Sequence, residues 1–396
     1  MKKKIIFMII NMNIGGTEKA LLNMISEIPT DKYDITLLLL EKYGGFLNYI
    51  PSGVNVKYLT EYKNIKDLYN NAPNQNIKTY IRQNKFHKAI QLFFSYYLSK
   101  LLRNRSTFFN YILKDIQSDD INYDIAIAYA GPMDLISYFV LNKIKAKKKF
   151  QWVHFDVSKI AFNADYEYKM YKKFDKIFIV SQQAREKFIK LLPSLKDKTE
   201  VIQNIVSQRL IYKEMKSANG FLDNFKGIRI LTIGRLTSEK GQDLAIKVLS
   251  RLIKNGYNIK WYCIGDGNSR KKYEQLINDY NLKNNFVLLG SDPNPYRYLD
   301  ECDIYVQPSR HEGFCITLAE AKCLNKPIVT TNFSGAKEQI DHGRTGLIVD
   351  INENDIYNGV VKLIENTNLR IIFETNLKND SKLSKRPLDR FYYYAK

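Results

Sequence analysis

The chain has 396 residues, of which 45% are hydrophobic and 26% are charged, with a net charge of +20. This balance is typical of a folded protein with room for two domains, and it excludes a disordered chain. No apolar run approaches the ~18 to 20 residues of a membrane-spanning helix, which excludes an integral membrane protein.

The first residues, "MKKKIIFMIINMNIGG", place three lysines before an apolar run that ends at Asn11. This run is shorter than the roughly 7 to 15 apolar residues of a secretory leader, so it predicts a buried first strand. The four cysteines, Cys263, Cys302, Cys315 and Cys323, include no C-x-x-C pair. Their spacing predicts neither a zinc site nor a disulfide framework and favours a cytoplasmic protein.

Short apolar runs alternate with helix-length segments along nearly the whole chain. In chain order they read "KIIFMII", "DITLLLL", "NVKYL", "DIAIAYA", "FQWVHF", "KIFIVS", "VIQNI", "IRILTIG", "IKWYCIG", "FVLLG", "IYVQPS", "PIVTT" and "GLIVD". Continuous rather than alternating apolar runs indicate strands buried on both faces, as in parallel sheets covered by helices.

The alternation is interrupted between Asn204 and Gly227, where we place a domain boundary. The predicted fold is α/β, with two doubly wound Rossmann-like domains that face an interdomain cleft. We assign residues 1–205 to the first domain and 206–370 to the second. Residues 371–396 form a tail, and whether it packs back on the first domain stays open.

A basic, aromatic stretch within the first domain predicts a helical insertion at about residues 60–116. Residues 57–114 contain 11 Lys and Arg against 2 Asp and Glu. One interpretation is a surface that lies on anionic lipid, where each basic residue contributes ~1 kcal/mol. The alternative is that Phe93, Phe94, Leu98, Leu101 and Leu102 belong to a core and the charges face solvent. Nucleic acid is disfavoured because no motif for it accompanies the charge.

Five polar or glycine-containing motifs directly follow predicted strands: "NIGG", "HFD", "GRLTSEKG", "GDG" and "HEGF". The carboxyl ends of parallel strands share one edge of a sheet, and ligands of doubly wound domains bind there. We therefore expect these motifs to line one interdomain cleft.

The first two motifs lie in the first domain. Gly15 and Gly16 precede a helix expected from about Thr17, and they let the backbone approach a phosphate or sugar; the alternative is a tight turn with Thr17 as N-cap. The motif is not G-x-G-x-x-G. His154, near Asp156, either serves a sugar hydroxyl and the reacting centre or is structural. No G-x-S-x-G elbow occurs, which argues against an acyl hydrolase.

Arg235 and Lys240 lie at the mouth of a predicted strand, with a helix expected near Gly241. A guanidinium fork and an ammonium suit a diphosphate, whereas the alternative is two solvated loop cations. The sequence contains no Asp-x-Asp and only four histidines. A dedicated divalent metal site is therefore not expected.

Two carboxylates, Glu312 and Glu320, lie in the stretch "RHEGFCITLAEAKCLNKPIV". We expect Glu312 on a loop and Glu320 in the first turn of a helix that starts near Thr317, where unpaired amides suit an anion. Carboxylates that accept hydrogen bonds from hydroxyls, beside amides that bind phosphate, favour a nucleotide-linked sugar. The alternative is an N-capping glutamate and a surface acid.

Taken together, these residues resemble the retaining glycosyltransferases of family four, which have the GT-B fold. The matching segments are "GGTE", "IVSQQAREKF", "VIQN", "GRLTSEKG", "IGDG", "HEGFCITLAEAKCLNKPIVTT" and "GAKEQIDHGRTGLIVD". The second half, about Ile228 to Asp350, carries the specific resemblance, and the Glu312–Glu320 spacing is the family's E-x7-E motif.

The resemblance implies roles for individual residues. Glu312 would hold hydroxyls of the donor sugar, Glu320 the ribose, Arg235 and Lys240 the diphosphate, and His154 would stand near the transferred sugar. The implied catalytic residues are Glu312, His154, Arg235 and Lys240. The implied donor-binding residues are Gly15, Gly16, Arg235, Lys240, Gly265, Glu312, Gly313, Phe314, Cys315, Ile316, Thr317, Leu318 and Glu320. Cys315 departs from the Gly or Pro of many members, which puts in doubt how closely this loop approaches the sugar.

The implied reaction is a retaining transfer, without metal or cofactor, from a nucleotide diphosphate sugar, with UDP as the expected nucleotide. The expected acceptor is a lipid-linked glycan or polysaccharide of a bacterial surface. The expected location is the cytoplasm, peripheral on the inner face of the cell membrane through residues 57–114, without nucleic acid as a partner. The alternatives are a nucleotide-sugar epimerase on the same fold and a catalytically inactive partner subunit.

Overall fold

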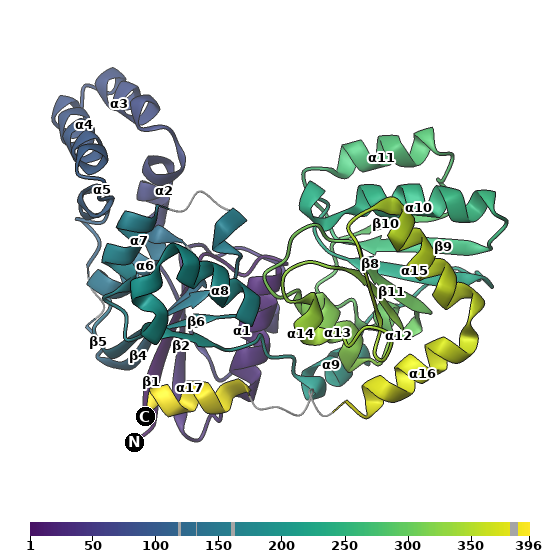
Figure 1. Ribbon diagram of the computed structural model, residues 1–396. Coiled ribbons are helices and arrows are strands. Elements are labelled where there is room, and N and C mark those ends of the chain that lie inside the picture. The colour runs from purple at the N-terminus through teal and green to yellow at the C-terminus, as the bar shows by residue number, and fades with distance from the viewer. Residues whose placement is uncertain (118–119, 132, 160–162, 381–386) are drawn as a thin grey trace.

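The structure is a computed structural model, and it describes residues 1–117, 120–131, 133–159, 163–380 and 387–396. In these residues the strands form two parallel sheets, each covered by helices on both faces (Figure 1). The prediction of two doubly wound α/β domains is confirmed. The sheets have the strand orders β3-β2-β1-β4-β5-β6-β7 and β10-β9-β8-β11-β12-β13.

The first sheet is built from the apolar runs of the first half of the chain. Its strands are β1 (Lys3–Ile9), β2 (Tyr33–Leu39), β3 (Asn55–Tyr58), β4 (Tyr123–Gly131), β5 (Ala146–Val153), β6 (Lys176–Ile179) and β7 (Thr199–Val201). The helices beside it are α1 (Gly16–Glu27), α6 (Asp134–Lys143), α7 (Ala164–Tyr171) and α8 (Gln182–Leu191), with short 3₁₀ turns η1 (Leu47–Tyr49), η2 (Val157–Lys159) and η3 (Pro193–Lys198). Residues 5–9 of β1 are all buried, as expected for a central strand with helices on both sides.

The second sheet repeats this arrangement. Its strands are β8 (Ile228–Ile233), β9 (Ile259–Ile264), β10 (Phe286–Gly290), β11 (Ile304–Gln307), β12 (Ile328–Thr331) and β13 (Leu347–Val349). Its helices are α9 (Gln208–Met215), α10 (Gln242–Lys254), α11 (Arg270–Asp279), α12 (Tyr296–Glu301), α13 (Ile316–Cys323), α14 (Ala336–Gln339), α15 (Glu353–Glu365) and α16 (Thr367–Lys378), with η4 (Ser238–Lys240). Ile211 of α9 is buried in the core of this second domain.

The chain ends with α17 (Pro387–Ala395), which lies against the first domain and not the second (Figure 1). Leu388, Phe391 and Ala395 are buried in the core cluster of the first sheet. The ring of Phe391 packs edge-on against Phe150 of β5, with 6.3 Å between centroids. The last helix therefore contributes apolar contacts to the domain that contains the N-terminus.

The basic stretch forms four helices that project from the first domain: α2 (Tyr62–Asn70), α3 (Pro73–Arg82), α4 (Phe86–Leu101) and α5 (Ser106–Ile112) (Figure 1). In α4 only one narrow face is buried, by Ala89, Leu92 and Ser99. The core interpretation of Phe93, Phe94, Leu98, Leu101 and Leu102 is wrong, because these side chains are 43% to 80% exposed. They face away from the rest of the insertion.

Candidate functional site

The predicted site residues come from five loops at strand carboxyl ends, and the structure brings the loops of both domains into contact. An ideal Cβ on Gly313 would lie 2.1 Å from the carbonyl oxygen of His154. The hydroxyl of Ser181 donates to the carbonyl oxygen of Gly313 at 3.0 Å. A Cβ on Gly16 would lie 3.6 Å from Cγ2 of Ile316. Gly313 thus allows the two domains to meet backbone to backbone, whereas Gly16 faces the Ile316 side chain at an ordinary contact distance.

The loop after β8 supplies Lys240, whose Nζ lies 2.6 Å from Oε1 of Glu312. The same carboxylate oxygen accepts a hydrogen bond from the Ser309 hydroxyl at 2.8 Å. Burial opposes the Lys240 charge, but the nearby Glu312 carboxylate outweighs it, so the pKa of Lys240 is raised. Gly241 follows in the left-handed region, with φ of 74°, and its Cβ would meet the Pro308 carbonyl oxygen at 2.0 Å. This turn therefore holds Lys240 beside Glu312.

Arg235 lies on the same loop, and its side chain is exposed. Among the described residues, no hydrogen bond or ion pair engages its guanidinium. Its charge acts on Lys240 and on the Glu18 carboxyl, whose pKa is raised to about 7, chiefly by burial and against the effect of Arg235. The Arg235 guanidinium is therefore available to an anion that enters between the domains.

Glu320 is 2% exposed, and the Tyr296 hydroxyl donates to its Oε1 at 2.8 Å. Burial raises the pKa of Glu320 to about 7, while Lys19 and the Tyr296 hydrogen bond act against this. We expected Glu320 in the first turn of a helix that starts near Thr317. The helix α13 begins at Ile316, so Glu320 belongs to its second turn. The Glu312 side chain is only 9% exposed. The interpretation of the two acids as a helix cap and a surface charge is therefore wrong.

Cys315 precedes α13 with a φ of 67°, in the left-handed region that non-glycine residues rarely adopt. Its side chain is buried, and the thiol lies 3.4 Å from Oγ1 of Thr317. By helix geometry the first amides of α13 point out of the helix end without an intrahelical acceptor. Phe314, Ile316 and Leu318 are buried beside this end. These first amides therefore follow directly, within a few residues of sequence, the loop that carries Glu312.

His154 follows β5, with its ring 4.6 Å from that of Tyr129 between centroids. Neither ring nitrogen has a hydrogen-bond partner among the described residues, although the side chain is buried. Burial lowers the pKa of His154 to about 3, so the imidazole is neutral at physiological pH. Asp156 is not its partner, because the carboxylate accepts from Lys187 Nζ at 2.5 Å.

The two other glycine positions have structural explanations. Gly265 has a φ of 143°, and its Cβ would lie 2.1 Å from the Gly234 carbonyl oxygen. Gly15 is the N-cap of α1, which begins at Gly16, so the alternative with Thr17 as N-cap is wrong. The helix starts one residue early because an extended Gly15 serves as its cap.

Sequence reasoning missed Lys19, Glu214 and Tyr296, which surround Glu320. Lys19 is buried, and its Nζ lies 2.8 Å from Oε2 of Glu214. The spacing of charges carries no signal for this pair, since the two residues are far apart in the chain. Only the proximity of Lys19 to the "IGGTE" motif could have indicated it.

Two further features of the chain are its possible metal-ligating groups and the state of its cysteines. Within the described ranges, no group of three or more His, Cys, Asp or Glu side chains is arranged to hold a metal ion. The four cysteines are free and buried. Metal independence stays a prediction.

The second half of the chain matches a known protein family. Residues 217–380 match the model of the glycosyl transferases group 1. This match covers less than half of the chain. The matched residues include Arg235, Lys240, Glu312 and Glu320. The match confirms the family resemblance, and the roles of these four residues stay predictions.

Two relatives extend this finding. An uncharacterised glycosyltransferase of Methanocaldococcus jannaschii is 35% identical over 180 residues, which is 44% of this chain and 44% of the relative. The N-acetylgalactosamine-N,N'-diacetylbacillosaminyl-diphospho-undecaprenol 4-alpha-N-acetylgalactosaminyltransferase of Campylobacter jejuni is 29% identical over 215 residues, 54% of this chain and 57% of the relative. The matches thus span about half the length of these relatives.

The whole chain shares its fold with solved structures. The HepE protein of Anabaena, in complex with UDP and glucose, aligns with a TM-score of 0.70 at 17% identity, over 99% of this chain and 98% of that one. This likeness covers both domains. At this identity it establishes the architecture alone.

Proposed function

We propose that the protein is a glycosyltransferase that moves a sugar from a nucleotide diphosphate sugar, with UDP as the nucleotide, to a surface-glycan acceptor. The observation that carries the proposal is the placement of Glu312 and Glu320 at the contact between the domains, with Lys240 bound to the first and Arg235 free beside it. Two acceptors for hydroxyls and two cations for a diphosphate match one ligand class.

Each residue then has one task at the donor. Arg235 and Lys240 neutralise the diphosphate, and the first amides of α13 donate to phosphate or sugar oxygens. Glu312 accepts from hydroxyls of the transferred sugar, and Glu320 accepts from the ribose. Lys240 leaves part of its contact with Glu312 to bind the phosphate, which frees that carboxylate for the sugar.

The proposed reaction retains the anomeric configuration by attack on the same face from which the phosphate leaves. The bond between the anomeric carbon and the phosphate oxygen breaks while the acceptor oxygen bonds to that carbon. The acceptor proton passes to the departing phosphate oxygen. The neutral imidazole of His154 can hydrogen-bond a sugar hydroxyl without adding charge beside the developing cation.

For the acceptor we propose a lipid-linked glycan. The Campylobacter relative carries diphospho-undecaprenol, a lipid carrier, in the name of its acceptor. The location we propose is the cytoplasm, peripheral on the inner face of the membrane. None of the helices in the described part of the chain combines the length and apolar character that a membrane span needs.

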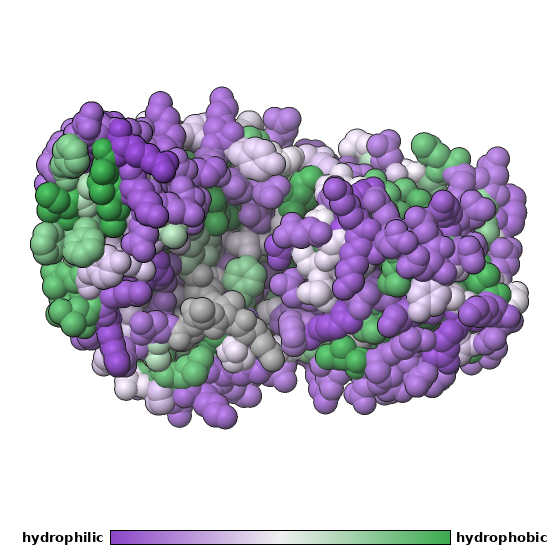
Figure 2. Space-filling view, turned by 90° about the horizontal axis from the view of Figure 1, so that it is seen from above, coloured by the Kyte–Doolittle hydropathy of each residue, from purple (hydrophilic) through white to green (hydrophobic). Residues whose placement is uncertain are grey.

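The membrane-facing surface we propose is the outward face of α4. Phe86, Ile90, Phe94, Leu98 and Leu101 recur at helical spacing, and all are exposed. Figure 2 shows hydrophobic side chains gathered at the end of the molecule where the insertion lies. Between Asp67 and Asp115 the sequence contains eight Lys and Arg and no Asp or Glu. Such a surface repels a second copy of itself and attracts anionic lipid headgroups.

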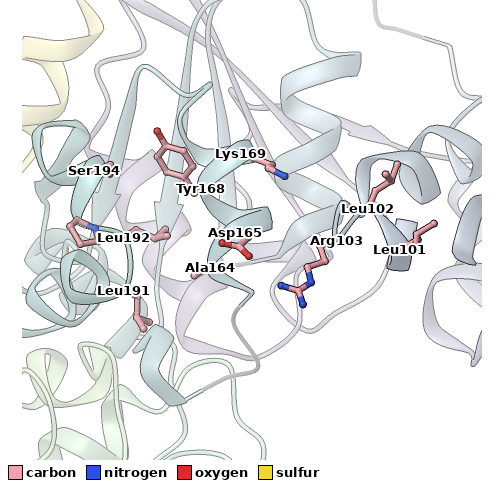
Figure 3. A pocket seen from close by; sticks show the side chains of 11 residues that line it. Leu101, Leu102, Arg103, Ala164, Asp165, Tyr168, Lys169, Leu191, Leu192 and Ser194 are labelled. Atoms are coloured by element: carbon pink, nitrogen blue, oxygen red, sulfur yellow. The ribbon is translucent and has the colours of Figure 1, made fainter. Parts of the chain in front are cut away.

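A cavity of about 440 Å³ continues this surface towards the body of the first domain. Leu101, Leu102 and Arg103 line one side, and Tyr168, Lys169 and Leu191 line the other, together with Asp165 (Figure 3). The leucines suit the hydrocarbon part of a lipid, and Arg103 and Lys169, with Asp165 as the one acid among the described lining residues, suit its phosphate. The cavity therefore extends the proposed contact with the bilayer.

The proposed activity is tested by the thermal stability of the protein with UDP, GDP, ADP and their sugars. A ligand at 100 times its Kd stabilises the folded state by ~2.7 kcal/mol, so the correct nucleotide raises Tm. We expect UDP to act on the wild type and on Glu274→Ala, an exposed glutamate of α11, but not on Glu320→Gln. No shift from any nucleotide would favour the inactive subunit. Conversion of the sugar without an acceptor would identify an epimerase.

The membrane contact is tested by co-sedimentation with vesicles of phosphatidylcholine, with and without phosphatidylglycerol. We expect binding that requires the anionic lipid and weakens with salt. The double variant Phe94→Ser with Leu101→Ser should lose it. Ile371→Ser, a matched change at an exposed position of α16, should not. Binding that is insensitive to anionic lipid and salt, or a dimer formed through α4 in solution, would contradict the proposal.

A further inference from the structure

Lys19 is a buried cation that the first domain inserts into the second. It lies in the first turn of α1 and is 5% exposed. Its Nζ is 2.8 Å from Glu214 of α9 and 4.8 Å from the ring centroid of Tyr296 in α12. The ring centroids of Phe46 and Tyr49, both in the first domain, lie 5.4 Å and 5.9 Å from the same Nζ. A lysine is rarely buried unless its charge is paired, so this placement is specific.

The same cluster reaches Glu320. The Tyr296 ring lies under the Lys19 ammonium, while its hydroxyl donates to Oε1 of Glu320 at 2.8 Å. The positive charge of Lys19 favours the ionised form of Glu320, whereas the negative charge of Glu214 disfavours it. Tyr305 of β11 and Cys323 of α13 also lie within electrostatic range of Glu320.

We propose that Lys19 is a positioning residue for the donor: it orients Tyr296 and supplies the positive charge that holds Glu320 ready to accept the ribose hydroxyls. This inference rests on the proposed function, because it takes Glu320 as the ribose-binding group. Lys19 itself makes no contact with the reacting atoms. It acts from the opposite domain through the groups that surround Glu320.

The physical reason is that an ionised carboxylate accepts hydrogen bonds from two hydroxyls, whereas a protonated one loses part of that capacity. When the domains separate, α1 withdraws Lys19 and leaves Glu320 near the negative charge of Glu214. Glu320 then binds a proton more readily. Closure and donor binding therefore favour each other, by the same factor in both directions.

A second contact between the domains separates this role from simple closure. Glu338 of α14 accepts hydrogen bonds from the backbone amides of Gln182 and Gln183, at 3.0 Å and 3.1 Å, at the start of α8. The Glu338 carboxylate also accepts from the side-chain amide of Gln203 at 3.4 Å, whereas the groups that act on Glu320 are Lys19, Tyr296 and Glu214. Glu338→Gln weakens closure and leaves the charges around Glu320 unchanged, so it serves as a matched control.

The experiment measures the Kd of UDP by calorimetry between pH 6 and 9 for the wild type, Lys19→Met, Lys19→Arg and Glu338→Gln. Loss of a nearby opposite charge raises a carboxyl pKa by roughly 1 to 3 units. With Glu320 starting near 7, a rise at the low end of this range, about one unit, makes Lys19→Met bind UDP about tenfold more weakly than wild type at pH 6.5 and within about twofold at pH 9. Lys19→Arg should keep the wild-type pH profile.

The control defines the outcomes that would overturn the inference. Glu338→Gln should lose UDP affinity by the same factor at every pH, because it leaves the charges around Glu320 unchanged. Ionisation of the UDP phosphate is common to all variants. If Lys19→Met shows that same pH-independent loss, or no loss, its role at Glu320 is refuted. If the wild type binds no UDP at any pH, the proposed function fails and this inference with it.

Discussion

Replacing Lys240 by methionine removes the ammonium and keeps most of the stem. Nζ of Lys240 lies 2.6 Å from Oε1 of Glu312, and the two side chains are 19% and 9% exposed. The variant leaves the Glu312 carboxylate buried with the Ser309 hydroxyl as its remaining partner. Removing one member of a buried pair costs ~3 to 5 kcal/mol. Because the lysine is partly exposed, we expect a loss of about 2 kcal/mol in the free energy of unfolding.

The same ammonium is proposed to bind the donor diphosphate. A hydrogen bond to a charged group contributes ~1.5 to 3 kcal/mol, so Lys240→Met should bind UDP roughly 10- to 150-fold more weakly. Stability and affinity therefore both fall, but for different reasons. The loss of stability comes from an unpaired Glu312, whereas the loss of affinity comes from the missing cation.

A cycle of four proteins separates the two effects: wild type, Lys240→Met, Glu312→Gln and the double variant. Urea unfolding gives the free energy of unfolding, and calorimetry gives the Kd of UDP. In the double variant neither charge remains, so we expect stability to recover by at least half of the ~2 kcal/mol. Affinity for UDP should stay as low as in Lys240→Met.

Two results would refute this reasoning. Wild-type affinity for UDP in Lys240→Met would remove Lys240 from the diphosphate site. Recovery of UDP affinity in the double variant would mean that the unpaired carboxylate distorted the Glu312 loop, and that the ammonium itself does not contact the phosphate.

Three further predictions follow from other parts of the molecule. Burial beside Asp134 raises the pKa of Glu167 well above its usual value. This carboxyl therefore favours folding below its unfolded pKa, and the contribution is lost as the pH rises. Glu167→Gln should be ~1 to 3 kcal/mol more stable at pH 7, and urea unfolding should show that its free energy of unfolding no longer falls between pH 5 and 8. Gly313→Ala places a Cβ against the His154 carbonyl and should reduce transfer activity at least tenfold in a product assay, whereas Gly53→Ala, which meets nothing within 4 Å, should not. Leu92→Ala, at a buried position, should cost ~2 to 4 kcal/mol, and Phe94→Ala, at an exposed one, less than ~0.5; equal losses would contradict the described orientation of α4.

Much of the candidate site could be predicted because its residues lie close to strand ends in the chain. Arg235 follows β8, Glu312 follows β11 and His154 follows β5, and parallel strands place such positions at one edge. Continuous apolar runs indicated these strands without any knowledge of their partners.

Other features depended on contacts between distant segments. Lys19 and Glu214 form an ion pair across 195 positions of sequence, and nothing local distinguishes them from solvated charges. The neutral state of His154 and the raised pKa of Glu320 arise from burial that only the packed domains produce. The start of α13 at Ile316 follows from the left-handed backbone of Cys315, which residue type alone does not predict.

The sequence by itself determined the two parallel-sheet domains and the set of polar residues at their edges, because strand burial and strand-end position are local patterns. Only the tertiary structure decided which face of α4 is exposed, which charge neutralises Glu312 and that Lys19 reaches the second domain. These depend on how two domains and an insertion pack together, and a hydrophobic or charged side chain in isolation fits either outcome.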